Sequence, residues 1–259
     1  MATLPPLAWT LVVLGGLAAG FIDSIAGGGG LITVPVLLAV GLPPHMALGT
    51  NKVQSVFGSG TAALRYGRKG LIPWRKISPG VILSLVASFL GAWTVKRINA
   101  SALEMILPFL LLLLWLYVAF KKDLGDSATQ QRLSPRLFYP LAGASIGFYD
   151  GFLGPGTGSF WTVSQVSLVG MDLKEATAAT KPANFASNVG ALAFFLFAGQ
   201  SAILVGLAMA AGQVAGAWLG SHLVIHHRPR FIRPFFLTVV AATVAKLFWD
   251  QFAGILLGL

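Results

Sequence analysis

Six stretches of this sequence are long and apolar enough to cross a lipid bilayer as helices. A helix rises about 1.5 Å per residue, so about 20 apolar residues span the roughly 30 Å hydrocarbon core. Of the 259 residues, 56% are hydrophobic and only 10% are charged, so a soluble fold would have no interior large enough for these segments. We therefore predict an all-α, polytopic integral membrane protein. Its full-length helices are expected over 45–66, 77–97, 102–120, 174–198, 201–225 and 230–254.

Two further apolar regions, 7–41 and 137–170, are each interrupted by glycine. The first contains four consecutive glycines at 27–30, and the second contains Gly-Pro-Gly-Thr-Gly at 154–158. The apolar stretch after each break has about ten to thirteen residues, which is too short for a full crossing by itself. Each region is therefore either a pair of crossings or a re-entrant hairpin.

The order of charged residues around the two breaks is the same. Asp23 precedes the first break and Lys52 follows it, whereas Asp150 precedes the second break and Lys181 follows it. Chance similarity between apolar segments is the alternative, but the shared order favours an internal duplication. Two further motifs, Gly-Ala-Trp and Pro-Phe, also recur in order, at 91–93 and 108–109 and again at 216–218 and 234–235.

Lysine and arginine gather on one side of the predicted helices, and Lys96 with Arg97 is the clear exception. Cytoplasmic loops carry an excess of these residues, so this side is predicted to be cytoplasmic and both termini to face outward. The residues on this side are Arg65, Arg68, Lys69, Arg75, Lys76, Lys121, Lys122, Arg132, Arg136, Lys174, Arg228, Arg230 and Arg233.

A hairpin and a pair of crossings both return the chain to the same side, so each half makes an odd number of net crossings. The second half then enters from the opposite face. This predicts two inverted-topology repeats, each with a glycine-broken helix and three full transmembrane helices. We place the first membrane repeat at 1–122, a cytoplasmic linker at 123–136 and the second membrane repeat at 137–259. Such repeats are typical of secondary transporters, whose substrate site lies near the bilayer midplane.

Composition argues against several other classes of protein. The formal charge of +10 is distributed among loops and not along one amphipathic face, so no nucleic-acid partner is expected. The absence of cysteine excludes disulfides, thiolate metal ligands and cysteine nucleophiles. His222, His226 and His227 have no accompanying carboxylate, so we predict no metal site and no cofactor.

The segment 143–147 fits the pattern Gly-x-Ser-x-Gly, but it lies inside an apolar helix and not at the strand-to-helix turn that a nucleophile elbow needs. No enzymatic activity is therefore expected. Glycine recurs at every fourth position from Gly143 to Gly151 and from Gly212 to Gly220. This spacing predicts close helix packing.

Once the basic residues at helix ends are assigned to the loops, only Lys52, Lys181 and Lys246 of the 18 basic residues remain inside predicted helices, and Lys246 is near the end of its helix. A buried ammonium group must meet an anion or lose its proton. We therefore expect the first two lysines to attract an anionic substrate. The alternative is that they form structural ion pairs with Asp23 and Asp150, in either combination.

Small polar residues surround each of these lysines. Asn51 and Ser55 are one helical turn apart, as are Asn184 and Asn188, so each pair can face one cavity. Amide and hydroxyl groups donate hydrogen bonds to oxyanions. Ordinary hydrogen bonding between helices is the alternative for any one of them. The predicted substrate-binding side chains are Asn51, Lys52, Gln54, Ser55, Thr180, Lys181, Asn184 and Asn188.

Each glycine break opens a short helix, whose free backbone N–H groups and positive dipole end suit an anion. A kink that permits tight packing is the alternative. The expected binding positions in the breaks are Gly28, Gly29, Gly30, Gly156, Thr157 and Gly158. Asp23 and Asp150 are candidates for proton coupling, because a low-dielectric setting favours a neutral carboxyl group. Capping or pairing with the lysines is an equally open role.

The motifs together resemble those of the TauE/SafE family of membrane permeases, also called the TSUP family. The resemblance covers nearly the whole chain, and its most specific parts are the residues 20–30 (GFIDSIAGGGG), 48–52 (LGTNK) and 179–185 (ATKPANF). It implies export or uptake of sulfite, organosulfonates or similar sulfur oxyanions across a bacterial inner membrane, with proton coupling. Members differ in substrate and direction, so the resemblance settles neither.

We therefore expect a secondary active transporter that binds one small anion near the midplane and works by alternating access. One alternative is a passive anion channel with the same donors. The other is an intramembrane hydrolase that uses Ser145 or Ser59, for which the sequence offers no histidine at the same depth.

Overall fold

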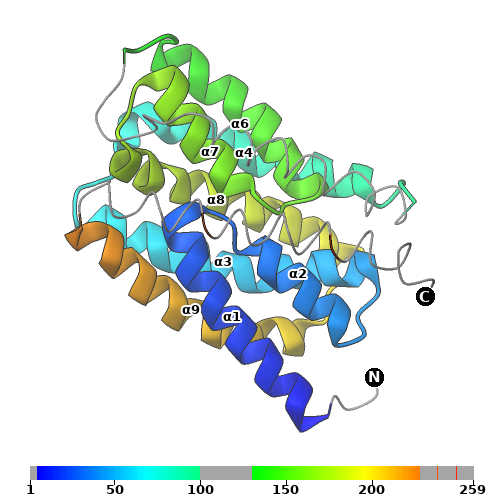
Figure 1. Cartoon of the computed structure of the whole chain (residues 1–259). Coiled ribbons are helices and arrows are strands. Elements are labelled where there is room, and N and C mark those ends of the chain that lie inside the picture. Colours follow the sequence, from blue (N-terminus) through cyan, green and yellow to red (C-terminus); the bar gives the residue numbers. More distant parts are fainter. Residues whose placement is uncertain (1–4, 100–129, 228–237, 239–248, 250–259) are drawn as a thin grey trace.

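The computed structural model describes residues 5–99 and 130–227, together with residues 238 and 249 (Figure 1). In this part of the chain the regular structure is helical, and it contains no strand. The predicted helices over 102–120 and 230–254, and most of the predicted linker over 123–136, lie outside the described residues. The described helices that are long and apolar enough to cross a membrane are α1 (Pro6–Ala26), α4 (Trp74–Val95) and α9 (Ile203–His226). The predicted helices over 45–66 and 174–198 form at full length, but they are less apolar and are not among these.

Each broken region forms a long helix followed by a short one. α1 ends at Ala26 because Gly27 adopts the left-handed conformation (φ 76°), a common helix C-cap, and donates its N–H to the carbonyl of Asp23 (2.8 Å). The short helix α2 (Gly30–Ala39) follows. In the second half, α6 (Pro135–Phe152) is followed by the short helix α7 (Thr157–Ser164). α7 continues into a π-helical turn, η1 (Gln165–Val169).

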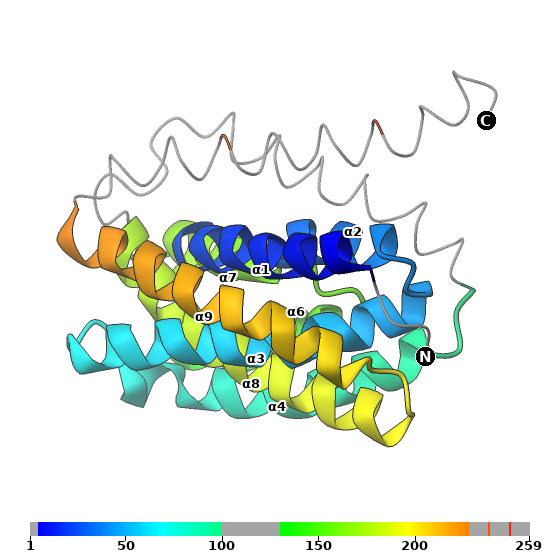
Figure 2. The same cartoon turned by 90° about the horizontal axis from the view of Figure 1, so that it is seen from below.

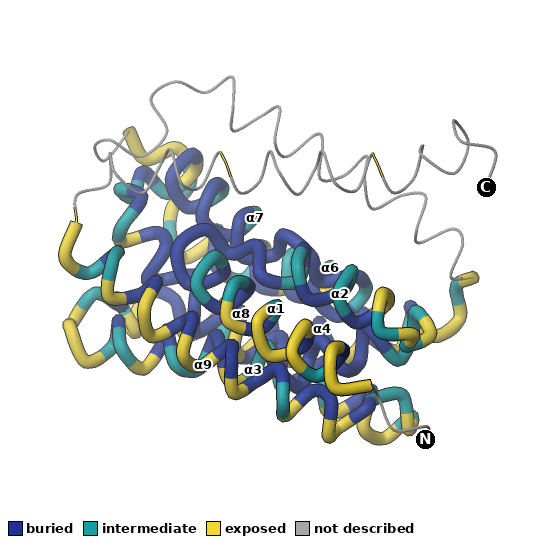
Figure 3. The backbone as a smooth tube through the Cα atoms, turned by 60° about the horizontal axis from the view of Figure 1, so that its bottom comes forward, coloured by how far each residue is buried: buried dark blue, intermediate teal, exposed yellow. Residues whose placement is uncertain are grey.

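Two long helices carry most of the predicted site. They are α3 (Pro44–Arg68) and α8 (Leu173–Phe197), and each has 25 residues. Their ends lie close to the predicted ends, as do those of α4 and α9. Their polar faces are turned inward, since Lys52 and Lys181 are each only 1% exposed. Figure 3 shows the buried backbone concentrated in the middle of the bundle, with exposed turns on its outside.

The helices form two outer pairs around this centre. α1 packs along α9 and α4 packs along α6, while α3 and α8 contact each other between the pairs (Figure 1). In Figure 2 the short helices α2 and α7 lie on one side of α3 and α8. When the two halves are exchanged, α1 takes the place of α6, α2 of α7, α3 of α8 and α4 of α9. The main helix contacts are then reproduced.

Close approach within the outer pairs depends on glycine, as the spacing predicts. A Cβ atom on Gly151 would overlap the carbonyl of Ser88 in α4, and one on Gly216 would overlap the carbonyl of Leu17 in α1. The Gly-x-Ser-x-Gly segment lies inside α6, where Ser145 donates to the carbonyl of Leu141 in its own helix (2.8 Å).

Candidate anion site at the two glycine breaks

The glycine breaks of the two halves touch each other at the centre of the bundle. A Cβ atom on Gly27 would overlap the backbone of Gly158, so the two segments meet only because both lack side chains. A Cβ atom on Gly30 would lie 3.3 Å from Cα of Pro155. The two breaks, far apart in the sequence, thus form one structural unit.

A small cavity lies at this junction. It offers about 20 Å³ to the centre of a water-sized sphere, which is room for about one water molecule. Every residue that lines it is a glycine or is polar. The lining residues are Asp23, Gly27, Gly30, Asn51, Ser55, Asp150, Gly154, Gly156, Thr157, Gly158, Asn184 and Asn188.

Most of the predicted site residues gather on this cavity. Six of the predicted positions do not line it, namely Gly28, Gly29, Lys52, Gln54, Thr180 and Lys181. Both lysines lie just behind the wall, on the aspartates. The structure therefore contains the ion pairs that were the alternative interpretation, while direct contact between the lysines and a substrate stays a prediction.

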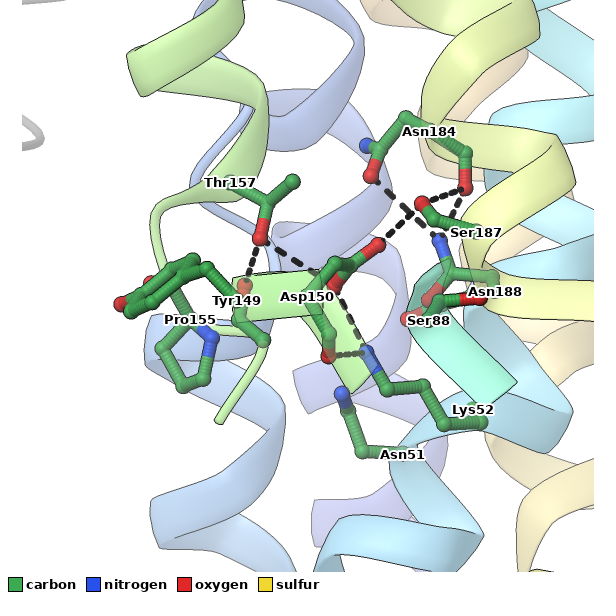
Figure 4. Close-up of polar contacts among 12 residues, drawn as sticks. Asn51, Lys52, Ser88, Tyr149, Asp150, Pro155, Thr157, Asn184, Ser187 and Asn188 are labelled. Carbon is green, nitrogen blue, oxygen red and sulfur yellow. Dashed lines mark hydrogen bonds and ion pairs between the residues drawn. The ribbon is translucent and has the colours of Figure 1, made fainter. Parts of the chain in front are cut away.

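Lys52 and Asp150 form a tight pair across the two halves (Figure 4). The ammonium group donates to Oδ1 of Asp150 (2.7 Å) and to its backbone carbonyl (2.6 Å). The same Oδ1 lies 3.1 Å from the hydroxyl of Thr157, and the other carboxylate oxygen accepts a hydrogen bond from Ser187. This buried carboxylate therefore has a partner on each oxygen besides its counter-charge.

The Lys52–Asp150 pair explains why residue 154 is a glycine. Its φ of +92° is rarely adopted by L-residues, and a Cβ atom there would lie 2.7 Å from Nζ of Lys52. The glycine thus lets the chain turn while the ammonium group passes close to the backbone.

Lys181 and Asp23 form the equivalent pair from the other half. The lysine donates to the backbone carbonyl of Asp23, but its distance to the carboxylate is longer, at 3.4 Å. Within the described residues, the hydrogen bond to the other carboxylate oxygen comes from the backbone N–H of Gly29, at 3.3 Å. Both pairs are crosswise, so each half of the chain supplies the counter-charge of the other.

A polar network in the first half aims an amide donor at the cavity. Oδ1 of Asn51 accepts hydrogen bonds from Thr33 of α2 (2.5 Å) and from Gln54 (2.7 Å). The carbonyl end of this amide is therefore occupied. Its NH₂ group lies toward the first break, because a Cβ atom on Gly30 would be 3.7 Å from it.

The second half contains a related network with a different direction. The hydroxyl oxygens of Thr162 (α7) and Thr180 (α8) are 3.2 Å apart. This contact corresponds to the hydrogen bond between Thr33 and Asn51 in the first half. Gln165 of η1 then donates to Thr180 (2.8 Å) and accepts from Tyr139 (3.1 Å). This chain leads away from the cavity toward the far end of the bundle.

Asn184 and Asn188 form the cavity wall on α8. Asn188 donates its amide to the backbone carbonyl of Asn184 (2.7 Å) and lies 3.5 Å from the side-chain oxygen of the same residue. Asn184 on α8 and Asn51 on α3 both line the cavity. The first turns of α2 and α7 carry no side-chain cap. The N–H groups of Leu31, Ile32 and Thr33 donate to the carbonyls of Gly28 and Gly29, and that of Thr157 donates to the carbonyl of Gly154.

A second and larger cavity lies at one end of the bundle. It offers about 370 Å³ and is lined by the α3–α4 connection, the residues before α6, and the start of α8. Lys76 and Glu175 are its charged residues, and Tyr139 forms part of its wall. The two cavities share no lining residue.

The sequence reasoning missed several members of the central unit. Gly27 and Gly154 line the cavity at the first position of each break, and Thr33, Thr162 and Gln165 orient the residues beside the lysines. A signal was available for the two glycines, because each lies next to predicted positions. The threonines are ordinary members of apolar stretches, and only the fold shows what they contact.

Known proteins resemble this chain over most of its length. The family model for the sulfite exporter TauE/SafE matches residues 12–247. A probable membrane transporter protein, ORF9, of a Sinorhizobium species is 44% identical over 232 residues, covering 90% of this chain and 89% of its own length. A probable membrane transporter protein of Haemophilus influenzae is 44% identical over 236 residues, covering 91% of this chain and 92% of its own length. YfcA of Escherichia coli K12, also a probable membrane transporter protein, is 39% identical over 246 residues, covering 95% and 91%.

Proposed function

The chain belongs to the sulfite exporter TauE/SafE family of membrane transporters, and we propose that it moves a small sulfur-containing oxyanion together with protons. Sulfite and organosulfonates are the substrate class. The observation that carries this proposal is the central cavity, because its lining consists of glycine backbone and polar side chains only. Backbone N–H groups, amides and hydroxyls that converge on one small space are the donors an oxyanion needs.

The lysines have an electrostatic role in this proposal. Each is neutralised by an aspartate, so the cavity wall carries no net charge from the two pairs and yet keeps two ammonium groups close behind it. The amides of Asn51 and Asn184 set the fit, and the backbone of Gly30 and Gly158 allows the anion to approach closely. An anion larger than the cavity requires the two halves to separate, which is the movement that alternating access provides.

The exchange of helix contacts between halves supports an inverted repeat, since α1 and α6 also run in opposite directions in Figure 1. In this arrangement one half rocks against the other around the two touching breaks. We place the protein in a bacterial inner membrane with both termini outside, on the basis of the basic loops.

Anion binding to the purified protein tests the site. Sulfite and methanesulfonate are titrated by calorimetry into the wild type, Asn51→Ala and Asn184→Ala. The control is Thr94→Ala, a half-buried position near the end of α4 that does not line the cavity. Loss of one charge-assisted hydrogen bond weakens binding by about 1.5–3 kcal/mol, roughly ten- to a hundredfold. Wild-type affinity in both asparagine variants would move the site elsewhere.

Accumulation distinguishes a transporter from a passive anion channel with the same donors. Proteoliposomes with an imposed pH gradient are expected to accumulate the radiolabelled anion above its external concentration. A channel dissipates an anion gradient and cannot build one. Flux that stops at equal concentrations under a pH gradient would favour the channel.

A further inference from the structure

The two buried ion pairs are chemically alike but unequally held. Both oxygens of the Asp150 carboxylate have close partners, and its side chain is only 3% exposed. The Asp23 carboxylate has long contacts on both oxygens, 3.4 Å and 3.3 Å, and its side chain is 12% exposed. Asp150 is thus fixed, whereas Asp23 is loosely paired and partly open to the central cavity that it lines.

Among residues 5–99 and 130–227, few titratable groups face Asp23. Lys181 faces it from α8, and Tyr66 of α3 donates its hydroxyl to the neighbouring carbonyl of Ser24 (2.8 Å). Asp150 with its partner Lys52 lies across the cavity on the α6 side. The helices α2 and α7 contain no titratable side chain, and α9 has histidines only in its last turns.

The backbone contact of Lys181 has a consequence for protonation. Its ammonium group is anchored on the carbonyl of Asp23 as well as near the carboxylate. When the carboxylate takes up a proton, an O–H bond forms and the negative charge is lost, but the lysine still has its carbonyl acceptor. The ammonium group behind the cavity wall then lacks its counter-ion. Because a buried ammonium group must meet an anion or lose its proton, proton uptake by Asp23 favours the entry of an anion into the cavity.

Resting on the proposed function, we propose that Asp23 carries the coupling proton. The Lys181 ammonium group attracts the anion once Asp23 is neutral, while the Lys52–Asp150 pair is structural. The charges balance simply. Two aspartates and two lysines sum to zero, one proton makes the site +1, and one monoanion restores neutrality. Proton and monoanion thus bind together in a 1:1 ratio and cross the membrane as an electroneutral unit. The site is specific for monoanions, since a dianion leaves one uncompensated negative charge.

Proton uptake during anion binding tests this assignment. Methanesulfonate is the probe, because it remains a monoanion throughout the working pH range. It is titrated calorimetrically into the purified full chain in buffers of different ionisation enthalpy, which yields the number of protons taken up per anion. The wild type is expected to take up about one proton per anion where Asp23 starts ionised. In that range its affinity falls about tenfold for each unit of rising pH.

Asp23→Asn is expected to take up no proton and to bind with an affinity independent of pH. Ser187→Ala, which removes a hydrogen bond to Asp150 without changing the charge of the site, is expected to keep the proton uptake. Asp23→Glu keeps a carboxyl group on α1 and is expected to keep the uptake with a shifted pH midpoint, which provides a second test if Asp23→Asn does not fold. Proton uptake that persists in Asp23→Asn, or an unchanged midpoint in Asp23→Glu, would overturn the assignment.

The outcomes separate this inference from the proposed function. If the wild type binds methanesulfonate without taking up protons, the coupling assignment is wrong and the anion site stands. If it binds neither methanesulfonate nor sulfite at any pH, the proposed function fails as well.

Discussion

The two halves of the chain place a lysine in the same sequence setting but in different physical surroundings. Lys52 follows Asn51 and reaches a carboxylate held by a serine and a threonine, whereas Lys181 follows Thr180 and reaches a carboxylate held by one long backbone contact. The polar network of the first half ends at the cavity, and that of the second half leads away from it. A duplicated motif has thus become one rigid pair and one pair suited to change its charge.

Removing the lysine of each pair should give the largest difference in stability between the two pairs. Lys52→Met leaves Asp150 buried without a counter-charge, and breaking such a pair costs about 3–5 kcal/mol. Lys181→Met should cost less, because Asp23 is more exposed and has looser contacts to lose. Thermal unfolding of both variants in the same detergent measures the difference. Equal losses would show that the two pairs do not differ as described.

Substitution of Gly154, which lies beside the Lys52 ammonium group, should have the next largest effect. Gly154→Ala combines a left-handed backbone with a Cβ atom 2.7 Å from Nζ of Lys52. Gly199→Ala is the matched control, because Gly199 also has positive φ (66°) but a Cβ atom there meets nothing within 4 Å. The left-handed conformation alone costs roughly 1–2 kcal/mol, so only that amount is expected at Gly199 and a larger loss at Gly154. Comparable melting temperatures in the two variants would contradict the close approach.

The hydrogen bond from Ser187 to Asp150 sharpens the assignment of the rigid pair. Ser187→Ala removes a hydrogen bond to a charged group, worth about 1.5–3 kcal/mol of stability. Proton uptake with methanesulfonate should nevertheless persist, because Asp23 is untouched. The variant is therefore checked by thermal unfolding and by calorimetry. Loss of proton uptake with normal stability would move the coupling role toward Asp150.

The smallest expected effect is that of membrane potential. A proton and a monoanion that cross together carry no net charge, so a potassium diffusion potential set with valinomycin should leave the initial rate of methanesulfonate uptake unchanged. A pH gradient of equal driving force should change it. A rate that follows the potential would contradict the 1:1 electroneutral unit.

Much of this architecture could be predicted from residue patterns. Hydropathy and the loops between the helices predicted the positions of α3, α4, α8 and α9. The cost of burying an ammonium group identified Lys52 and Lys181 as residues that need partners. The choice of partner could not be predicted, because crosswise and same-half pairing are equally compatible with the order of residues. Likewise, Thr33 and Thr162 resemble any threonine in an apolar helix. The contact between Gly27 and Gly158 depends on how the two halves pack, which no local pattern encodes.

The central claim is that one anion binds between the two glycine breaks, and the position of a bound anion tests it most directly. Selenite, a heavier analogue of sulfite, can be located by the anomalous scattering of selenium in crystals of the protein. One selenium site is expected in the central cavity, between Gly30 and Gly158 and within hydrogen-bonding reach of Asn51 and Asn184. Selenium bound only at the end cavity beside Lys76, with none between the breaks, would contradict the account.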